Sequence, residues 1–183
     1  WGGYSEYIRV PSEWVLPLPK NLSPKEAMIL GTAGMTAGLS VSELFLNKIE
    51  EDGKIIVSGA TGGVGLISLA ILVSQGFSVT AVTGKIDMHS LLKKIGATEI
   101  ISREDLQNDS GKPLLKGEYS GAIDVAGGNT LNSILKRLKF DGIATCCGLV
   151  DSPKLETTVF PFILRGIRLI GIDSAESNLK HRE

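Results

Sequence analysis

A glycine-rich stretch from Ser58 to Gly65 reads SGATGGVG and is followed at once by the apolar run LISLAILVSQG. A strand pattern, KIIV, precedes it and a helix pattern follows. Such a strand–turn–helix junction presents free backbone N–H groups and a helix dipole, and both favour a pyrophosphate. Within a βαβ unit, this is the context in which a G-x-G-x-x-G turn binds a dinucleotide. The stretch therefore predicts a cofactor site, with Ala60 in the first glycine slot.

Each position of the turn has a physical requirement. Gly62 lets the backbone approach the phosphates, and Gly65 lets the helix pack closely. Ala60 is tolerable if it keeps a negative φ. A P-loop is excluded because no glycine is followed by the required Lys-Ser or Lys-Thr pair. A tyrosine with a lysine four residues later, the catalytic pair of short-chain dehydrogenases, is also absent.

The end of the second strand pattern, AVTGK, bears on the choice between NAD and NADP. NAD-type sites place an acidic residue there, about 20 residues after the turn, to bind the ribose 2′-hydroxyl. This chain has Thr83, Gly84 and Lys85 instead. A hydroxyl, a flexible glycine and a cation suit a 2′-phosphate. Asp87 is interpreted as a cap of the next helix. The sequence thus favours NADP, although a lysine in a loop is commonly only solvated.

Composition limits the other possibilities. Lys plus Arg (19) nearly balances Asp plus Glu (20), so charge gives no case for a nucleic-acid or membrane-surface partner. Cys146 and Cys147 are adjacent in an apolar segment and have no spacing typical of a metal site or a disulfide framework. We interpret them as reduced, buried strand residues in a cytoplasmic protein. We also expect no apolar run near the roughly 20 residues that span a bilayer.

The elements that must position these residues alternate. Residues 1–22 predict a short strand and proline-rich turns, and Ser23-Pro24-Lys25-Glu26 predicts a helix start with a capping box. From residue 52 onward, six apolar strand patterns are separated by helices, and a polar connection runs from residue 102 to 118. In the helix after the turn, Val64, Ile67, Ile71 and Leu72 are expected to face the sheet. The fold class is α/β: a Rossmann, doubly wound, parallel six-stranded sheet with helices on both faces.

Three segments carry a family resemblance: GGYSEYIRVPSEWVLPLPKNLSPKEAMILGTAGMTAGLSV, SGATGGVG and VFPFILRGIRLIGIDS. They resemble the medium-chain dehydrogenase/reductase superfamily, and within it the zinc-free acryloyl-CoA reductase and quinone oxidoreductase branch. The resemblance implies that residues 1–22 are a remnant of a GroES-like catalytic domain. It implies that residues 23–183 are the NADP-binding Rossmann domain with its leading helices. The chain, which begins with Trp1, would be a fragment without the carboxyl-terminal return to the catalytic domain.

The resemblance also implies which residues bind NADP. Thr61, Gly62, Gly63 and Val64 would contact the pyrophosphate. Thr83, Gly84 and Lys85 would contact the ribose that carries the 2′-phosphate. Leu149, Ile163 and Ser174 would complete the cleft near the nicotinamide. By propensity alone, the last three would be ordinary core or turn residues.

The implied activity is hydride transfer from NADPH to an activated double bond, as in acryloyl-CoA, or to a quinone. No catalytic acid is assigned, and no metal ligand. Two alternatives remain open: a non-catalytic NADPH-binding regulatory module, and the cofactor domain of a zinc alcohol dehydrogenase. The partner is expected to be a small-molecule substrate. A homodimer is a further expectation, because RLIGID is predicted to be an edge strand that can pair with a second copy.

Overall fold

The computed structural model describes residues 3–108 and 111–177. Parts of three predicted segments lie outside these residues: the first two residues of the proposed remnant, residues 109–110 of the polar connection, and the charged end from 178 to 183. All statements below concern the described residues.

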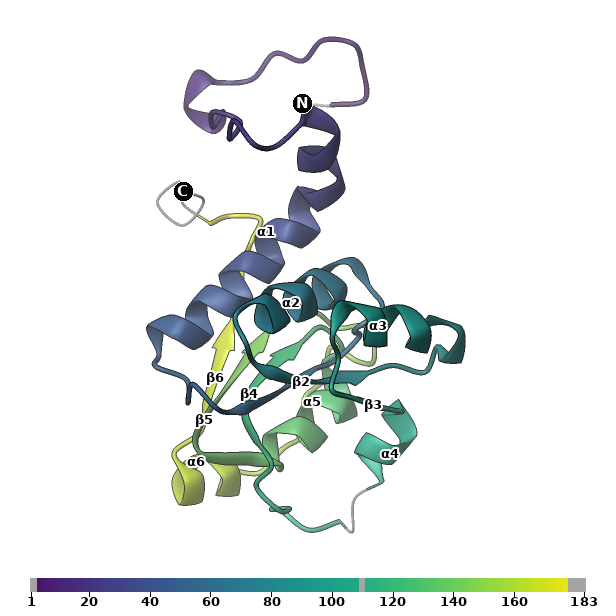
Figure 1. Ribbon diagram of the computed structural model, residues 1–183. Helices are drawn as coiled ribbons and strands as arrows, with labels where there is room; N and C mark the ends of the chain where they lie inside the picture. Colours follow the sequence, from purple (N-terminus) through teal and green to yellow (C-terminus); the bar gives the residue numbers. More distant parts are fainter. Residues whose placement is uncertain (1–2, 109–110, 178–183) are drawn as a thin grey trace.

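Six strands form one parallel sheet, as the sequence predicted (Figure 1). The strands are β1 (Lys54–Val57), β2 (Ser78–Val82), β3 (Glu99–Ile101), β4 (Tyr119–Asp124), β5 (Leu138–Cys146) and β6 (Arg168–Gly171). Their order, β3-β2-β1-β4-β5-β6, reverses direction between β1 and β4. This is the doubly wound Rossmann order, and it opens a crevice at the carboxyl ends of these two strands. The expected edge position of β6 is confirmed.

Helices cover both faces of the sheet. They are α1 (Pro24–Leu46), α2 (Gly63–Ser74), α3 (His89–Ile95), α4 (Arg103–Gln107), α5 (Gly128–Leu135) and α6 (Phe160–Arg165). Successive side chains of β1 alternate between two hydrophobic clusters. Ile55 and Val57 pack with residues of α1, α2 and α3, whereas Ile56 packs with residues of α4, α5 and α6. A strand that is buried on both faces needs this continuous apolar sequence.

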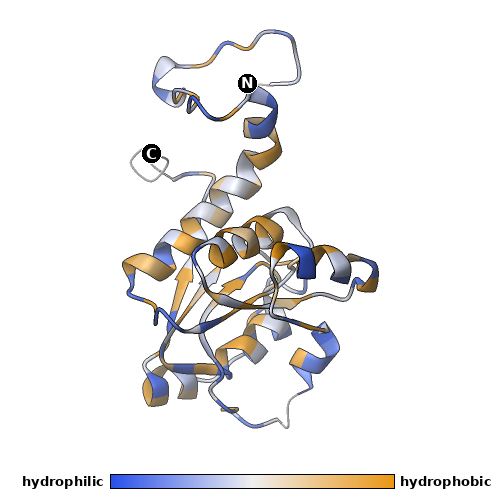
Figure 2. Ribbon diagram, in the orientation of Figure 1, coloured by the Kyte–Doolittle hydropathy of each residue, from blue (hydrophilic) through white to orange (hydrophobic). Residues whose placement is uncertain are grey.

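Helix α1 begins with the predicted capping box, in which the Ser23 side chain accepts a hydrogen bond from the Glu26 N–H and the Glu26 carboxylate accepts one from the Ser23 N–H. Its helical geometry is interrupted at Gly31, where φ is 45°. The part beyond this break packs on α2 and buries residues such as Val41 and Leu44. The part before it projects from the domain with exposed apolar side chains (Figures 1 and 2).

The expectation about apolar length is wrong for α1. This helix has the length and hydropathy of a membrane span. The sequence pattern obscured this, because small residues and hydroxyl residues interrupt its apolar runs. A core helix passes the same test, and the burial of its second half fits that description.

Two other local predictions are wrong. In the described part of residues 3–22 there is one 3-10 helix, Ser12–Trp14, and no strand, because no neighbouring strand is available to pair with this exposed segment. Asp87 lies in a second 3-10 helix, Ile86–Met88, and caps nothing, since α3 begins after Met88.

The predicted face of α2 is right for Leu72 and wrong for its other three residues. Its fully buried residues are Gly65, Ser68, Leu69 and Leu72, whereas Val64, Ile67 and Ile71 are half-buried. Helix α2 is packed between the sheet and α1, so apolar residues occur all round it and the periodicity marks no single face.

Candidate cofactor-binding site

A hollow of about 290 Å³ lies at the carboxyl ends of β1, β2 and β4. Its lining comes from the ends of five strands and the segments that follow them. The lining residues are Gly59, Thr61, Gly62, Val82, Thr83, Gly84, Lys85, Arg103, Val125, Ala126, Thr130 and Val150. The predicted turn residues and the predicted ribose-end residues are therefore brought together in one place. This is the crevice in which doubly wound sheets bind ligands.

The turn between β1 and α2 has the conformation that a dinucleotide turn requires. Gly59 has a φ of 55°, and the Val125 side chain occupies the space that a Cβ at position 59 would need. Ala60 is not in the positive-φ region, which confirms that this alanine is compatible with the turn. A Cβ on Gly65 would lie 2.4 Å from the Gly59 carbonyl oxygen, so α2 packs directly on the turn.

The helix that follows leaves backbone donors for a ligand. Gly62 is the N-cap of α2, and no side chain caps this helix. Gly62 and Gly63 are exposed, and Val64 is half-buried in the first turn. Because the first N–H groups of a helix have no partner within it, this N-terminus can bind a phosphate group.

At the end of β2, Thr83 is buried and connects two segments. Its hydroxyl lies 3.3 Å from the Thr61 hydroxyl and accepts a hydrogen bond from the Lys85 N–H at 3.1 Å. The side-chain cations of Lys85 and Arg103 are exposed, and neither pairs with another described residue. No carboxylate is among the described lining residues. Two unpaired cations and a hydroxyl beside a small hollow fit a phosphate dianion.

Arg103 was missed by the sequence analysis. It is the first residue of α4, directly after β3 and Ser102, and thus some way along the chain from Lys85. The available signal was a cation placed just after a strand. The carboxyl ends of adjacent parallel strands lie at one edge of the sheet, so a cation after β3 approaches a cation after β2.

A second hollow of about 590 Å³ lies beside the first, at the carboxyl ends of β5 and β6. Leu149 lines it, together with Gly127 and Ile172 among others. Ser174 follows β6, and its hydroxyl lies 2.7 Å from that of Thr36 on α1. Ser174 itself lines neither hollow, and neither does Ile163, which is exposed on α6. The assignment of these two residues to the cofactor cleft therefore depends on the resemblance alone.

Both cysteines are free and half-buried at the end of β5. Burial raises the pKa of the Cys146 thiol, and the nearby Asp124 carboxyl raises it further. Among the described residues, no three His, Cys, Asp or Glu side chains gather as metal ligands.

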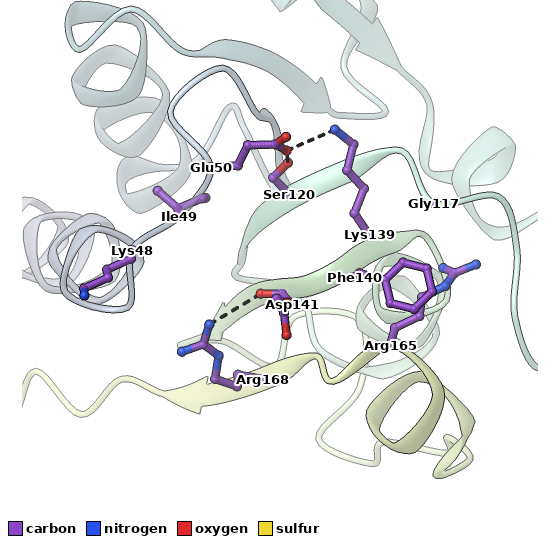
Figure 3. A pocket seen from close by; sticks show the side chains of 10 residues that line it. All are labelled: Lys48, Ile49, Glu50, Gly117, Ser120, Lys139, Phe140, Asp141, Arg165 and Arg168. Atoms are coloured by element: carbon purple, nitrogen blue, oxygen red, sulfur yellow. Dashed lines mark hydrogen bonds and ion pairs between the residues drawn. The ribbon is translucent and has the colours of Figure 1, made fainter.

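A third hollow, of about 590 Å³, lies at the amino ends of β4, β5 and β6, away from the glycine turn (Figure 3). Glu50 accepts hydrogen bonds from Ser120 and, at 3.1 Å, from Lys139, and these bonds hold its pKa below the ordinary value. Arg165 donates to the carbonyl oxygen of Leu138 at 2.7 Å. Because these charged groups already have partners within the protein, we assign no cofactor to this hollow.

The sheet order, the glycine turn and the hollow lined by Lys85 and Arg103 together define a dinucleotide-binding domain of the Rossmann class. The chain belongs to the zinc-binding dehydrogenase family, whose model matches residues 63–181. The predicted relationship to the acryloyl-CoA reductase and quinone oxidoreductase branch is confirmed by the following similarities.

The putative quinone oxidoreductase YhfP of Bacillus subtilis is 48% identical over 174 residues, which cover 94% of this chain and 53% of that protein. Its crystal structure with NAD bound matches 99% of this chain and 55% of that chain, with a TM-score of 0.95. The probable acrylyl-CoA reductase AcuI of Escherichia coli is 41% identical over 175 residues, 95% of this chain and 53% of that protein.

The yhdH oxidoreductase of Salmonella enterica, crystallised in complex with NADP, is 42% identical. The match has a TM-score of 0.93 and covers 99% of this chain and 56% of that chain. The chain therefore spans about half the length of the relatives that it matches.

Proposed function

We propose that residues 23–183 form the NADP-binding domain of an NADPH-dependent oxidoreductase, and that residues 1–22 belong to its catalytic domain. The observation that carries this proposal is the charge of the hollow beside the end of β2. Among the described residues, Lys85 and Arg103 have no side-chain partner there, and none of the lining residues is a carboxylate that could bind a ribose 2′-hydroxyl. The NADP-bound yhdH structure supports the proposal, whereas the NAD-bound YhfP structure makes a direct comparison of the two cofactors necessary.

Two groups of residues fit the two ends of the cofactor. The backbone of residues 61–64 would hold the pyrophosphate at the uncapped N-terminus of α2. The Thr83 hydroxyl, the Gly84 backbone and the cations of Lys85 and Arg103 would hold the adenosine end with its 2′-phosphate. Leu149 would lie toward the nicotinamide. So would Ser174 and Ile163, on grounds of the resemblance.

When bound, NADPH supplies a hydride for an electron-poor double bond or a quinone. What this domain would contribute is orientation of the cofactor, because the two hollows both lie at the carboxyl ends of the strands. We propose an enoyl thioester such as acryloyl-CoA as the substrate, because the relative AcuI is named as a probable acrylyl-CoA reductase. A quinone is the alternative, because the relative YhfP is named as a quinone oxidoreductase. The substrate is a small molecule, and we propose no nucleic-acid or membrane partner.

A cofactor titration tests the binding proposal. NADPH and NADH are titrated into the chain and into the variants Lys85→Ala and Arg103→Ala by calorimetry. Each variant loses charge-assisted hydrogen bonds to the 2′-phosphate, so NADPH affinity is expected to fall about ten- to a hundred-fold while NADH affinity changes less than about three-fold. The matched control is Lys20→Ala, an exposed lysine outside the hollow, which should change neither affinity. Equal losses for NADPH and NADH would contradict the 2′-phosphate assignment.

A second assay tests the reaction. NADPH oxidation is followed with acryloyl-CoA, crotonyl-CoA and a quinone, using a protein that joins this domain to its catalytic domain. Faster turnover of one class identifies the substrate. A protein that binds NADPH but oxidises it with none of these would fit the regulatory-module alternative, and it would remove the reductase proposal without affecting the cofactor proposal.

We also propose a cytoplasmic location and a homodimer. Two adjacent free cysteines suit a reducing compartment. The β6 edge has strand hydrogen-bonding groups that a second copy can pair with. Light scattering of the purified protein tests the dimer: a monomeric mass at all concentrations up to the millimolar range would contradict it.

A further inference from the structure

Asp124, at the carboxyl end of β4, is completely buried and makes hydrogen bonds in two directions. Its Oδ1 atom accepts a hydrogen bond from the Ser58 hydroxyl at 2.6 Å. Its Oδ2 atom accepts one from the Gly127 N–H at 2.7 Å. The Ser58 hydroxyl in turn accepts a hydrogen bond from the Val125 N–H at 2.9 Å. The carboxyl group therefore joins the residue after β1 to the turn after β4.

These two turns both line the first hollow. The turn after β1 contributes Gly59, Thr61 and Gly62, directly after Ser58. The turn after β4 contributes Val125 and Ala126. The two turns are in contact, because the Val125 side chain fills the space beside Gly59. The hydrogen bond between Ser58 and Asp124 joins the turns and therefore helps to set where the residues after Ser58 lie.

Asp124 also borders the second hollow. Its partner Gly127 lines that hollow, and so does Cys146, whose sulfur lies 3.9 Å from the Asp124 Oδ2 atom. Gly127 pairs with Ser152 through a parallel bridge, so the segment after β5 is held to the same turn. One buried side chain thus connects the segments after β1, β4 and β5.

This arrangement has an energetic cost. Burial raises the pKa of the Asp124 carboxyl, although the hydrogen bonds from Ser58 and Gly127 act in the opposite direction. A buried carboxyl group is costly unless its hydrogen bonds are satisfied, and an apolar residue could fill the space without that cost. The presence of Asp124 at the junction of three segments that face the proposed cofactor site indicates that it holds these segments in place.

We propose that Asp124 is a positioning residue for the pyrophosphate–nicotinamide half of the cofactor, acting through Ser58 and Gly127 on the two turns that border it. The inference depends on the proposed NADP-binding function. Lys85 and Arg103, which are proposed to bind the 2′-phosphate, follow β2 and β3 and, within the described part of the chain, make no hydrogen bond to Asp124, Ser58 or Gly127.

The test compares two ligands, NADPH and adenosine 2′-monophosphate, which carries the 2′-phosphate and neither phosphate of the pyrophosphate. The variants are Asp124→Asn and Ser58→Ala, and the second is the milder change in case the first does not fold. Both are expected to weaken NADPH binding about ten-fold, because losing one hydrogen bond to a charged group has an effect of this order. Binding of the monophosphate is expected to change less than two-fold, and Lys85→Ala should weaken binding of the monophosphate and of NADPH alike.

Ser68→Ala is the matched control, because Ser68 is a completely buried serine on α2 whose hydroxyl has no hydrogen-bond partner. It should change neither affinity. If Ser58→Ala lowers the affinity for both ligands equally, the effect is a general structural one and the positioning role is overturned. Unchanged NADPH affinity in Ser58→Ala would also overturn the positioning role. If the unmodified chain binds neither ligand, the proposed function itself fails, and the inference fails with it.

Discussion

The contact between α2 and the glycine turn gives a quantitative prediction for Gly65→Ala. The new Cβ would lie 2.4 Å from the Gly59 carbonyl oxygen and 2.9 Å from the Ala60 Cα, whereas ordinary contacts begin at 3.4 Å. The turn and the helix must therefore separate by about 1 Å, and overpacking of this kind costs about 1–3 kcal/mol. Alanine's helix propensity returns at most about 1 kcal/mol, so the free energy of unfolding should fall by about 1–2 kcal/mol.

The same displacement moves the backbone groups proposed to hold the pyrophosphate, so NADPH affinity should fall about ten-fold as well. Urea denaturation and calorimetric titration measure the two effects. Gly38→Ala is the matched control: it lies within α1, nothing is within 4 Å of its Cβ, and it should stabilise the chain by about 0.5–1 kcal/mol. If Gly65→Ala is as stable as the unmodified chain and binds NADPH equally well, the reasoning about close packing is refuted.

Two further predictions concern stability. Lys48 ends α1 in a Schellman arrangement with a φ of 58°, so Lys48→Gly should raise the free energy of unfolding by about 1 kcal/mol in urea denaturation, and a lower value would contradict this. Burial, with smaller effects from Asp124 and Cys146, raises the pKa of Cys147 from 9.0 to about 11. The unfolded chain then releases this proton before the folded chain does, so stability should fall between pH 9 and 11. Urea midpoints should show a smaller fall in Cys147→Ala, and equal falls would contradict the shift.

The fold was predictable because its signals are local. The capping box of Ser23 and Glu26 and the apolar strand patterns each depend on a few neighbouring residues, and the structure confirms both of them. Where tertiary surroundings decide, the predictions were wrong. The amino-terminal segment has no strand partner in the described residues, and the face of α2 cannot be identified because α1 covers its second side.

The candidate site divides in the same way. The residues of the glycine turn and of Thr83 to Lys85 follow a strand directly, and Thr61 and Gly62 of the first set line one hollow with the second set. Arg103 follows a third strand, β3. Its closeness to Lys85 can be predicted only when the order of the strands in the sheet is known. Asp124 could not be recognised from sequence, because its role depends on contacts between segments that are 66 residues apart.

The central claim is that NADP binds with its 2′-phosphate between Lys85 and Arg103. A crystal structure of this chain grown with NADP⁺ tests it most directly. The account predicts that the pyrophosphate lies against the N-terminus of α2, with the 2′-phosphate within hydrogen-bond distance of both cations and of Thr83. A cofactor bound elsewhere, or one whose 2′-phosphate points into solvent away from both cations, would contradict it.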